Sequence, residues 1–200
     1  KELQVAHPRN VLKKFSIEYW DDIEYFKNRN VMEAKFFVDA HFFIKLFNPK
    51  NVLDAGCGMG QRVLALRSFG VEAFGFDKSR FAVMHTPFAI SDFLKQGDVV
   101  SGIPFEQDFG LIIAYDLLEH LKEEEIEPAL LNLWGAGGKD SKWVFSVCFE
   151  KDPNFPLDKT HVTCWTREQW EKKLQDAGFI TLPTPDGMPY AHQIIVCGRI

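Results

Sequence analysis

The chain has 200 residues, of which 46% are hydrophobic and 26% charged, and this composition suits one globular domain with a sizeable core. A net charge of −5 at pH 7 leaves no broad basic surface for a long phosphate backbone, so nucleic acid is an unlikely substrate. No apolar run approaches the roughly 18 residues of a membrane span, and no secretory signal pattern is present. We expect a cytoplasmic protein without membrane attachment; its oligomeric state stays open.

The first 48 residues predict helices. In residues 11–30, apolar and aromatic side chains recur at spacings of four, four and three, which is typical of an amphipathic helix: Phe15, Tyr19, Ile23 and Phe26. Residues 31–47 are denser in phenylalanine and end before a proline. We expect a helical cap over residues 1–48. Its phenylalanines should pack in the core, whereas three residues with polar tips either line a substrate pocket or pack there too: Tyr19, Trp20 and Tyr25.

Residues 51–61 predict a strand, a tight turn and the start of a helix. Apolar residues lead to Asp54, and glycines follow at every second position: Gly56, Gly58 and Gly60. Glycine permits a sharp turn and leaves no Cβ where a ligand lies against the main chain, while a helix N-terminus presents N–H groups. A nicotinamide dinucleotide site would need glycine at position 61, where the chain has Gln61. The spacing therefore argues against a nicotinamide dehydrogenase.

A second short strand is predicted over residues 73–77, and it ends in an acid, Asp77. The carboxylate there can accept hydrogen bonds from two neighbouring ribose hydroxyls. At these residues the chain resembles the class I S-adenosylmethionine-dependent methyltransferases. Their first motif has the form hydrophobic-hydrophobic-Asp-x-Gly-x-Gly-x-Gly, and their second strand ends in the ribose-binding acid.

The resemblance extends over about residues 50 to 200. Residues 96–99 look like the family's third-strand segment, where Asp98 would reach the adenine amino group. Residues 109–121 look like the fourth strand and a following helix, and residues 135–138 take the place of a Lys-Pro-Gly-Gly loop. Gly110 and the pair at 135–136 depart from the family pattern, at positions that do not normally touch the cofactor.

The resemblance implies an α/β fold, a Rossmann-like doubly wound sheet over residues 49–200 that is mostly parallel with an antiparallel C-terminal strand at 193–200. It also implies S-adenosyl-L-methionine as the cofactor. The residues expected to contact this cofactor are Asp54, Ala55, Gly56, Cys57, Gly58, Gly60, Asp77, Lys78, Asp98, Val99 and Tyr115.

Local signals predict the remaining elements. Ser79 is a candidate cap for a helix over 78–84, and residues 142–149 read as the fifth strand. A helix over 166–179 should begin with a capping box and close at a glycine: Thr166, Gln169 and Gly178. Four scattered cysteines without zinc-site spacing predict reduced, mostly buried thiols: Cys57, Cys148, Cys164 and Cys197.

Two histidines are candidate catalytic bases. Methyl transfer from a sulfonium is an in-line displacement with a good leaving group, so the protein needs at most a base for the acceptor proton. His120 follows the fourth strand and His161 lies some way after the fifth, so both can reach the acceptor side. The alternative for each is a polar support for its own loop. Asp158 either orients the His161 loop or is an ordinary turn residue.

A cation site is a competing interpretation. Asp116, Glu119 and His120 have the i, i+3, i+4 spacing of one helical face, and His161 could complete the ligand set. The pattern resembles that of the small-RNA 3′-end 2′-O-methyltransferases, and residues 165–168 add to the likeness; ubiquinone-pathway O-methyltransferases have a similar Glu-x-x-Glu-His version. Metal-free members share the Glu-His and Thr-His elements, however, and metal-using members have Glu in place of Asp116. We therefore predict no metal.

These features predict a methyltransferase that moves a methyl group from S-adenosylmethionine to an oxygen or nitrogen of a small-molecule acceptor. Two alternatives stay open. One is an RNA 3′-end 2′-O-methyltransferase that uses a divalent cation, which the acidic charge disfavours. The other is a non-catalytic S-adenosylmethionine-binding subunit.

Overall fold

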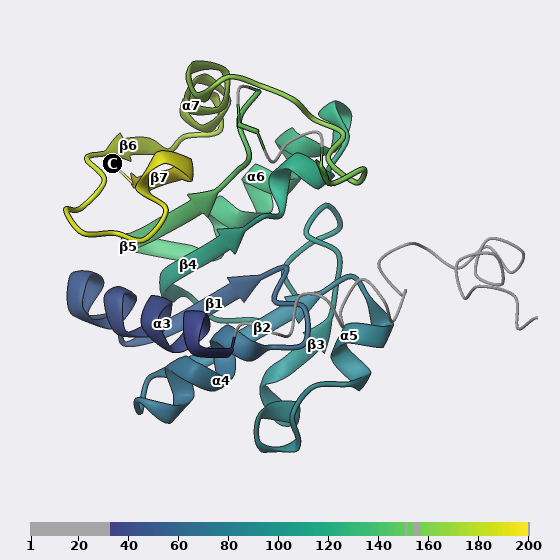
Figure 1. The fold of residues 1–200 in the computed structure, drawn as a ribbon, viewed down its shortest axis with the longest axis vertical. Helices are drawn as coiled ribbons and strands as arrows, with labels where there is room; N and C mark the ends of the chain where they lie inside the picture. The colour runs from purple at the N-terminus through teal and green to yellow at the C-terminus, as the bar shows by residue number, and fades with distance from the viewer. Residues whose placement is uncertain (1–32, 151, 154–156, 200) are drawn as a thin grey trace, which may run out of the picture.

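A seven-stranded sheet forms the centre of the protein in the computed structural model, which describes residues 33–150, 152–153 and 157–199 (Figure 1). Its strand order is β3-β2-β1-β4-β5-β7-β6. Neighbouring strands are parallel from β3 to β5, and β7 runs antiparallel to both β5 and β6. The strands are β1 Asn51–Ala55, β2 Glu72–Asp77, β3 Leu94–Gln96, β4 Phe109–Tyr115, β5 Gly137–Ser146, β6 Ile180–Leu182 and β7 Ile194–Gly198.

Helices cover both faces of this sheet. The α-helices are α3 Glu33–Phe47, α4 Gln61–Ser68, α5 Arg80–Met84, α6 Glu123–Gly135 and α7 Arg167–Asp176, and the 3-10 helices are η3 Phe88–Phe93, η4 Leu118–His120 and η6 Ala191–Gln193. Side chains of α3 and α4 share one buried cluster with one face of the sheet, and side chains of α6 and α7 share another cluster with the opposite face. The predicted doubly wound α/β fold is therefore confirmed.

Strand β4 shows why the sheet needs cover on both sides. Its sequence is an almost continuous apolar run, which is typical of a parallel strand with two buried faces. Successive side chains of a strand point to opposite faces. Leu111 and Ile113 accordingly join the cluster under α3 and α4, and Ile112 and Ala114 join the cluster under α6 and α7. Full burial of one such Leu or Ile side chain stabilises the fold by about 1.5–3 kcal/mol.

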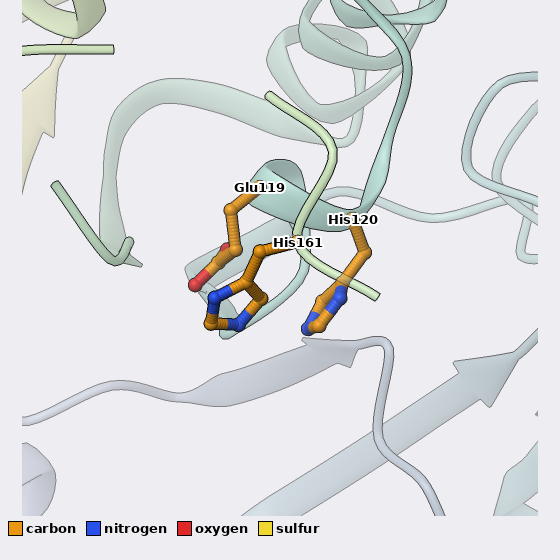
Figure 2. A group of neighbouring side chains, drawn as sticks. All are labelled: Glu119, His120 and His161. Atoms are coloured by element: carbon orange, nitrogen blue, oxygen red, sulfur yellow. The ribbon is translucent and has the colours of Figure 1, made fainter. Parts of the chain in front are cut away.

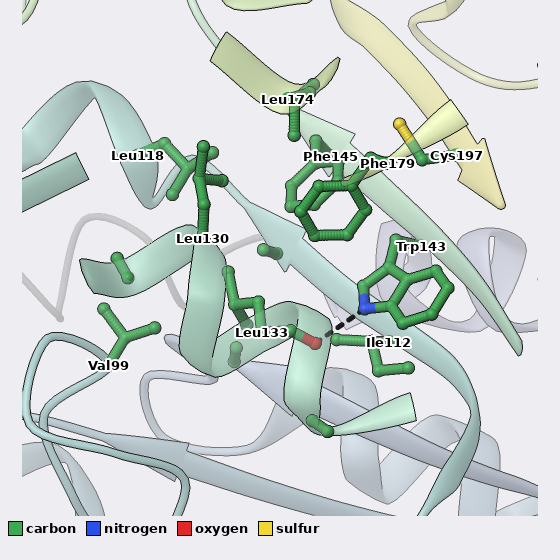
Figure 3. Close-up of a cluster of buried hydrophobic side chains, with 14 of the residues drawn as sticks. Val99, Ile112, Leu118, Leu130, Leu133, Trp143, Phe145, Leu174, Phe179 and Cys197 are labelled. Carbon is green, nitrogen blue, oxygen red and sulfur yellow. Dashed lines mark hydrogen bonds between the residues drawn. The ribbon is translucent and has the colours of Figure 1, made fainter. Parts of the chain in front are cut away.

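The cluster under α6 and α7 ties β5 to helix α6 (Figure 3). Trp143 is fully buried, and its indole N–H donates to the Leu133 carbonyl over 2.7 Å. A buried tryptophan usually finds a partner for this N–H, because leaving the group without one is costly. Phe179 packs edge-on against both Trp143 and Phe145 and so attaches the segment after α7 to the same core.

Several local predictions are confirmed. The hydroxyl of Ser79 accepts a hydrogen bond from Ala82 N and caps α5. Thr166 and Gln169 form the capping box of α7, and Gly178 takes a φ of +95° beyond the end of that helix. The predicted helix over 31–47 is present from residue 33, whereas the predicted helix over 11–30 lies outside the described residues, together with Tyr19, Trp20 and Tyr25.

Other local predictions are wrong. Residues 135–138 are not a separate loop, because α6 runs to Gly135 and β5 already begins at Gly137, where an added Cβ would lie 2.4 Å from the Trp143 ring. The fifth strand is present, but it begins at Gly137 and ends at Ser146, so only the bounds of the predicted 142–149 strand are wrong. Strand β6 was not predicted, because its three residues are too few to show a period and are followed by a proline. Among the described residues, no helix is long and apolar enough to cross a membrane.

Candidate active site

The carboxyl ends of the parallel strands form the edge at which the site lies. The chain moves outward from β1 to β2 and β3 and then returns to β4 on the other side of β1. In open α/β sheets, ligands bind beyond the carboxyl ends of the strands at such a switch point. Every residue predicted to contact the cofactor lies at or just beyond the carboxyl end of a strand. Asp54 and Ala55 are the last residues of β1 and precede the glycine turn, and Asp77 and Tyr115 are the last residues of β2 and β4. Lys78 follows β2, and Asp98 and Val99 follow β3.

The glycine turn has a backbone that only glycine adopts readily. Gly56, Gly58 and Gly60 have φ angles of +71°, +56° and +81°. The amides of Gly56 and Cys57 donate to the Phe76 carbonyl over 2.9 and 3.0 Å, which holds the turn against β2. A Cβ on Gly60 would lie 2.6 Å from Leu94, so the turn also lacks space for a side chain. The glycines therefore fix the shape of the turn and let it pack closely against its neighbours.

Asp77 connects the end of β2 to the glycine turn. One carboxylate oxygen accepts from Gly58 N over 2.7 Å, and the other accepts from Ser79 N over 2.8 Å. Each oxygen of a carboxylate can accept more than one hydrogen bond, so a ligand hydroxyl could share Asp77 with these amides. Next to it, the ammonium of Lys78 lies 3.2 Å from the Asp98 carboxylate, which also accepts from Val100 N over 3.0 Å. These bonds set the spacing between the loops after β2 and β3.

Asp54 is buried beneath the turn, with an exposure of only 1%. Its carboxylate accepts from the Arg62 guanidinium over 2.9 Å, and Asp39 of α3 lies 3.9 Å from the same guanidinium. Burial raises the pKa of Asp54, and the positive charge of Arg62 opposes this rise. The guanidinium carbon also lies 4.5 Å from the centroid of the Tyr115 ring. Asp54 is thus paired with Arg62 inside the protein.

Arg62 and Asp39 were not predicted as members of the site. One signal was available: an aspartate at the end of an apolar strand requires a cation or several hydrogen-bond donors when it is buried. Arg62 stands in the first turn of the following helix and is the nearest arginine in the sequence. Nothing in the sequence pointed to Asp39, because its partner comes from a different element.

Burial also raises the pKa of the Tyr115 phenol, which is therefore protonated at neutral pH.

Glu119, His120 and His161 come together beyond the end of β4 (Figure 2). The centroids of the two imidazole rings are 4.7 Å apart. Glu119 is only 1% exposed, and its carboxylate accepts from Cys148 N over 3.0 Å. One ligand atom from each of the three residues lies within 4.8 Å of the others, so the group could hold a divalent cation. Two imidazoles and one carboxylate suit transition-metal ions better than Mg²⁺, which prefers oxygen ligands.

Asp116 does not join this cluster, although the competing cation interpretation included it. The i, i+3, i+4 argument needs an α-helix, but the chain after β4 has a positive φ of 49° at Asp116 and then the short 3-10 helix η4. The Asp116 carboxylate instead accepts from the Ser146 hydroxyl over 3.1 Å at the end of β5. The group that could hold an ion therefore contains Glu119, His120 and His161 and does not include Asp116.

A doubly wound sheet with an antiparallel β7, a glycine turn after β1 and an acid at the end of β2 is the fold that the resemblance to S-adenosylmethionine-dependent methyltransferases implied. Residues 25–183 match the methyltransferase domain family, and the chain belongs to this family. Its cofactor is therefore S-adenosylmethionine. No curated protein matches the chain.

Solved structures share the fold at low sequence identity. Magnesium protoporphyrin IX methyltransferase ChlM from Synechocystis, with bound SAH, has a TM-score of 0.69 and 17% identity over 94% of this chain and 100% of that chain. A TehB-like SAM-dependent methyltransferase from Corynebacterium glutamicum has a TM-score of 0.62 and 21% identity over 98% and 99%. The complex between the Haloferax volcanii Trm112 methyltransferase activator and a putative methyltransferase contains a chain with a TM-score of 0.69 and 15% identity over 90% and 97%.

Proposed function

We propose that the protein is an enzyme that transfers a methyl group from S-adenosylmethionine to an oxygen or nitrogen of a small-molecule acceptor. The observation that carries this proposal is the pair of His120 and His161, whose ring centroids are 4.7 Å apart; His120 follows β4, and His161 lies between β5 and α7. The end of β4 adjoins the switch point between β1 and β4, where a cofactor in this fold is expected. The acceptor atom and a base would then lie side by side.

The residues at the sheet edge fit the cofactor. Gly56, Gly58 and Gly60 hold the turn in a left-handed backbone close to β2, and the Asp77 carboxylate at the end of β2 is an acceptor for ribose hydroxyls. When bound, S-adenosylmethionine supplies a methyl group on a positively charged sulfur, which leaves as a neutral thioether. We assign Asp77 to the ribose, Asp98 and Val99 to the adenine, and the glycine turn to the amino acid portion.

The chain's own part in the reaction is alignment and proton removal. One imidazole accepts the proton of the acceptor hydroxyl or amine while the acceptor atom forms its bond to the methyl carbon. General base catalysis of this kind contributes about 10²- to 10⁴-fold. Holding the acceptor in line with the methyl group contributes further, because the reacting atoms no longer have to meet by diffusion.

Two observations support a small-molecule acceptor. The net charge of −5 disfavours a long polyanion. The structural neighbour ChlM is, by its name, a methyltransferase for magnesium protoporphyrin IX, which is a small molecule. These observations fit many hydroxyl- and amine-bearing compounds, so the test samples a range of them.

A panel of such metabolites with labelled S-adenosylmethionine tests the proposal. We expect methyl transfer to at least one compound. His120→Ala and His161→Ala should lower turnover by about 10²- to 10⁴-fold while cofactor affinity is retained. The matched control is His192→Ala, because His192 is exposed on η6, far along the chain from both histidines. Undiminished turnover in both site variants would contradict the base assignment, and cofactor binding without any transfer would favour a non-catalytic subunit.

The group of Glu119, His120 and His161 supports a second candidate, a cation-dependent transfer to the 2′-hydroxyl at an RNA 3′ end. Three potential ligand atoms within 4.8 Å of one another are the specific observation in its favour. A short RNA with a 3′-terminal diol should then be methylated in the presence of Mn²⁺, and a chelator should abolish activity. Activity that a chelator leaves unchanged would exclude this candidate and leave the small-molecule reaction intact.

A further inference from the structure

The loop of residues 157–163 contacts His120 through its ring nitrogen Nδ1. Two oxygen atoms of Thr160 lie near this nitrogen: the carbonyl oxygen at 3.2 Å and the hydroxyl oxygen Oγ1 at 3.0 Å. We propose that Asp158 and Thr160 are positioning residues that hold His120 in one tautomer, with the proton on Nδ1 and the lone pair on Nε2. This inference rests on the proposed function in one respect, namely that the lone pair serves methyl transfer.

The direction of the hydrogen bonds follows from the donors available. The Asp158 carboxylate oxygen Oδ1 accepts from Thr160 N over 3.0 Å and from the Thr160 hydroxyl over 2.5 Å. A carboxylate has no proton to donate, and a hydroxyl has only one. The single proton of the Thr160 hydroxyl is therefore directed to Asp158.

The state of the imidazole follows from this. Since its proton is directed to Asp158, Thr160 Oγ1 can only accept from the His120 ring, and the Thr160 carbonyl oxygen can only accept as well. Both neighbours of Nδ1 are acceptors, so Nδ1 must carry a proton. In a neutral imidazole the other nitrogen then has the lone pair, because the hydrogen bond made by one ring nitrogen sets the state of the other.

The loop is fastened to the segment that carries His120, so this arrangement is held in place. The amides of Val162 and Thr163 donate to the Glu119 carbonyl over 2.9 and 3.1 Å, and the hydroxyl of Thr163 donates to the Leu121 carbonyl over 2.5 Å. Thr163 is fully buried. Val162 and Thr163 are thus bonded to the carbonyls of the residues before and after His120, which holds the loop beside it.

The consequence for chemistry is that the lone pair of His120 lies on Nε2, which one ring carbon separates from Nδ1. Nε2 is buried in the structure, beside the His161 ring whose centroid is 4.7 Å from that of His120 (Figure 2), so a proton reaches it only from a group bound within this cluster. An imidazole in the other tautomer could not accept a proton at Nε2. The same lone pair would be the ligand if a cation bound here, because a hydrogen bond to the second ring nitrogen fixes the tautomer and orientation of a ligating histidine.

The competing explanation is that Asp158 and Thr160 only form a turn that stabilises the loop. The two explanations differ in what replacement of the hydroxyl does to the imidazole. A turn residue would affect stability alone, whereas a positioning residue would affect the distribution of the proton between Nδ1 and Nε2. The conservative change Thr160→Ser keeps the hydroxyl, and Thr160→Val removes it at nearly constant shape.

Nitrogen NMR of the full chain with ¹⁵N-labelled histidine distinguishes them, with His120 assigned by its loss in His120→Gln. At about pH 8, above the ordinary histidine pKa of about 6.5, we expect Nδ1 protonated and Nε2 unprotonated in the wild type. Thr160→Val removes the hydroxyl acceptor and leaves the Thr160 carbonyl, so it should shift His120 partly toward a mixture, while Thr160→Ser and the control Thr86→Val should keep the wild-type pattern. A proton on Nε2 in the wild type would overturn the tautomer assignment, and an unchanged pattern in Thr160→Val would overturn the positioning role of Asp158 and the Thr160 hydroxyl.

Kinetics supply the second readout. Thr160→Val should lower kcat by about 10- to 100-fold, the usual effect of losing a group that orients a functional histidine, with cofactor affinity unchanged. Thr160→Ser should restore most of kcat. The spectrum needs no substrate, so a failure of the proposed function would leave the tautomer result intact. A failure of this inference would instead leave methyl transfer intact in Thr160→Val.

Discussion

The guanidinium of Arg62 donates to the carboxylate of Asp54 over 2.9 Å, and both side chains are almost fully buried. Asp54 lies in the strand before the glycine turn and Arg62 in the helix after it. The pair therefore fastens the two ends of the turn to each other. Removing one member of a buried pair leaves an uncompensated charge and costs about 3–5 kcal/mol, far more than an exposed pair contributes.

We accordingly expect Arg62→Met to lower the free energy of unfolding by about 3–5 kcal/mol in urea denaturation. The matched control is Lys172→Met, which breaks the exposed pair of Lys172 with Asp176 on α7 and should cost at most about 1 kcal/mol. Equal losses in the two variants would contradict the structural role of the buried pair.

The defect of Arg62→Met should also depend on pH. Burial raises the pKa of Asp54, and Arg62 lowers it, so removal of Arg62 must raise that pKa further. A group whose pKa is raised in the folded state favours folding below its unfolded pKa, and this benefit is lost as pH rises through the folded value. The free energy of unfolding lost in Arg62→Met relative to wild type should therefore be larger at about pH 8 than at about pH 4, which is near the ordinary aspartate pKa. A difference that shrinks as pH rises would be inconsistent with this account.

Substitutions at Gly60 and Gly70 distinguish the cost of backbone strain from the cost of overpacking. Both have a φ of +81°, but a Cβ on Gly60 would lie 2.6 Å from Leu94, whereas a Cβ on Gly70 would meet nothing within 4 Å. Gly70→Ala should cost about 1–2 kcal/mol of stability through backbone strain alone. Gly60→Ala should cost about 1–3 kcal/mol more through overpacking, and it should weaken cofactor binding. Thermal unfolding of both variants, with calorimetry for the cofactor, checks this; equal effects would rule out the packing argument.

Features that depend on a short local pattern of residues could be predicted from the sequence. The glycine turn, the acid at the end of β2 and the capping box of Thr166 follow from local chemistry, because each needs particular residue types at fixed spacing. The contact between Thr160 and His120 spans 40 residues and depends on how one loop lies on another. No local pattern encodes such a contact. The interpretation that placed Asp116 beside Glu119 and His120 is wrong because it assumed an α-helix that the chain does not form there.

Asp77→Ala should weaken S-adenosylmethionine binding by about 1–3 kcal/mol, because it removes a charge-assisted acceptor at the expected ribose position. Loss of the bond to Gly58 N contributes to this effect by loosening the turn. Glu72→Ala is the matched control, as Glu72 is an exposed acid at the opposite end of the same strand. Calorimetry measures both. An unchanged affinity in Asp77→Ala would remove the ribose assignment.

The four thiols should differ in reactivity. Cys164 is exposed, whereas Cys57, Cys148 and Cys197 are buried. Burial raises the pKa of Cys148 and of Cys197 to about 12, so both are protonated at neutral pH. We expect one thiol to react rapidly with an aromatic disulfide reagent in the native protein and four after denaturation. Cys164→Ser should remove the rapid phase, and rapid labelling of any other cysteine would contradict the described burial.

Calorimetric titration with S-adenosylmethionine, with NAD as the comparison ligand, tests the central claim most directly. The glycine turn that lacks a glycine at position 61 and the acid at Asp77 should bind one molecule of S-adenosylmethionine per chain and bind NAD far more weakly. Tight binding of NAD together with no measurable heat from S-adenosylmethionine would contradict the account.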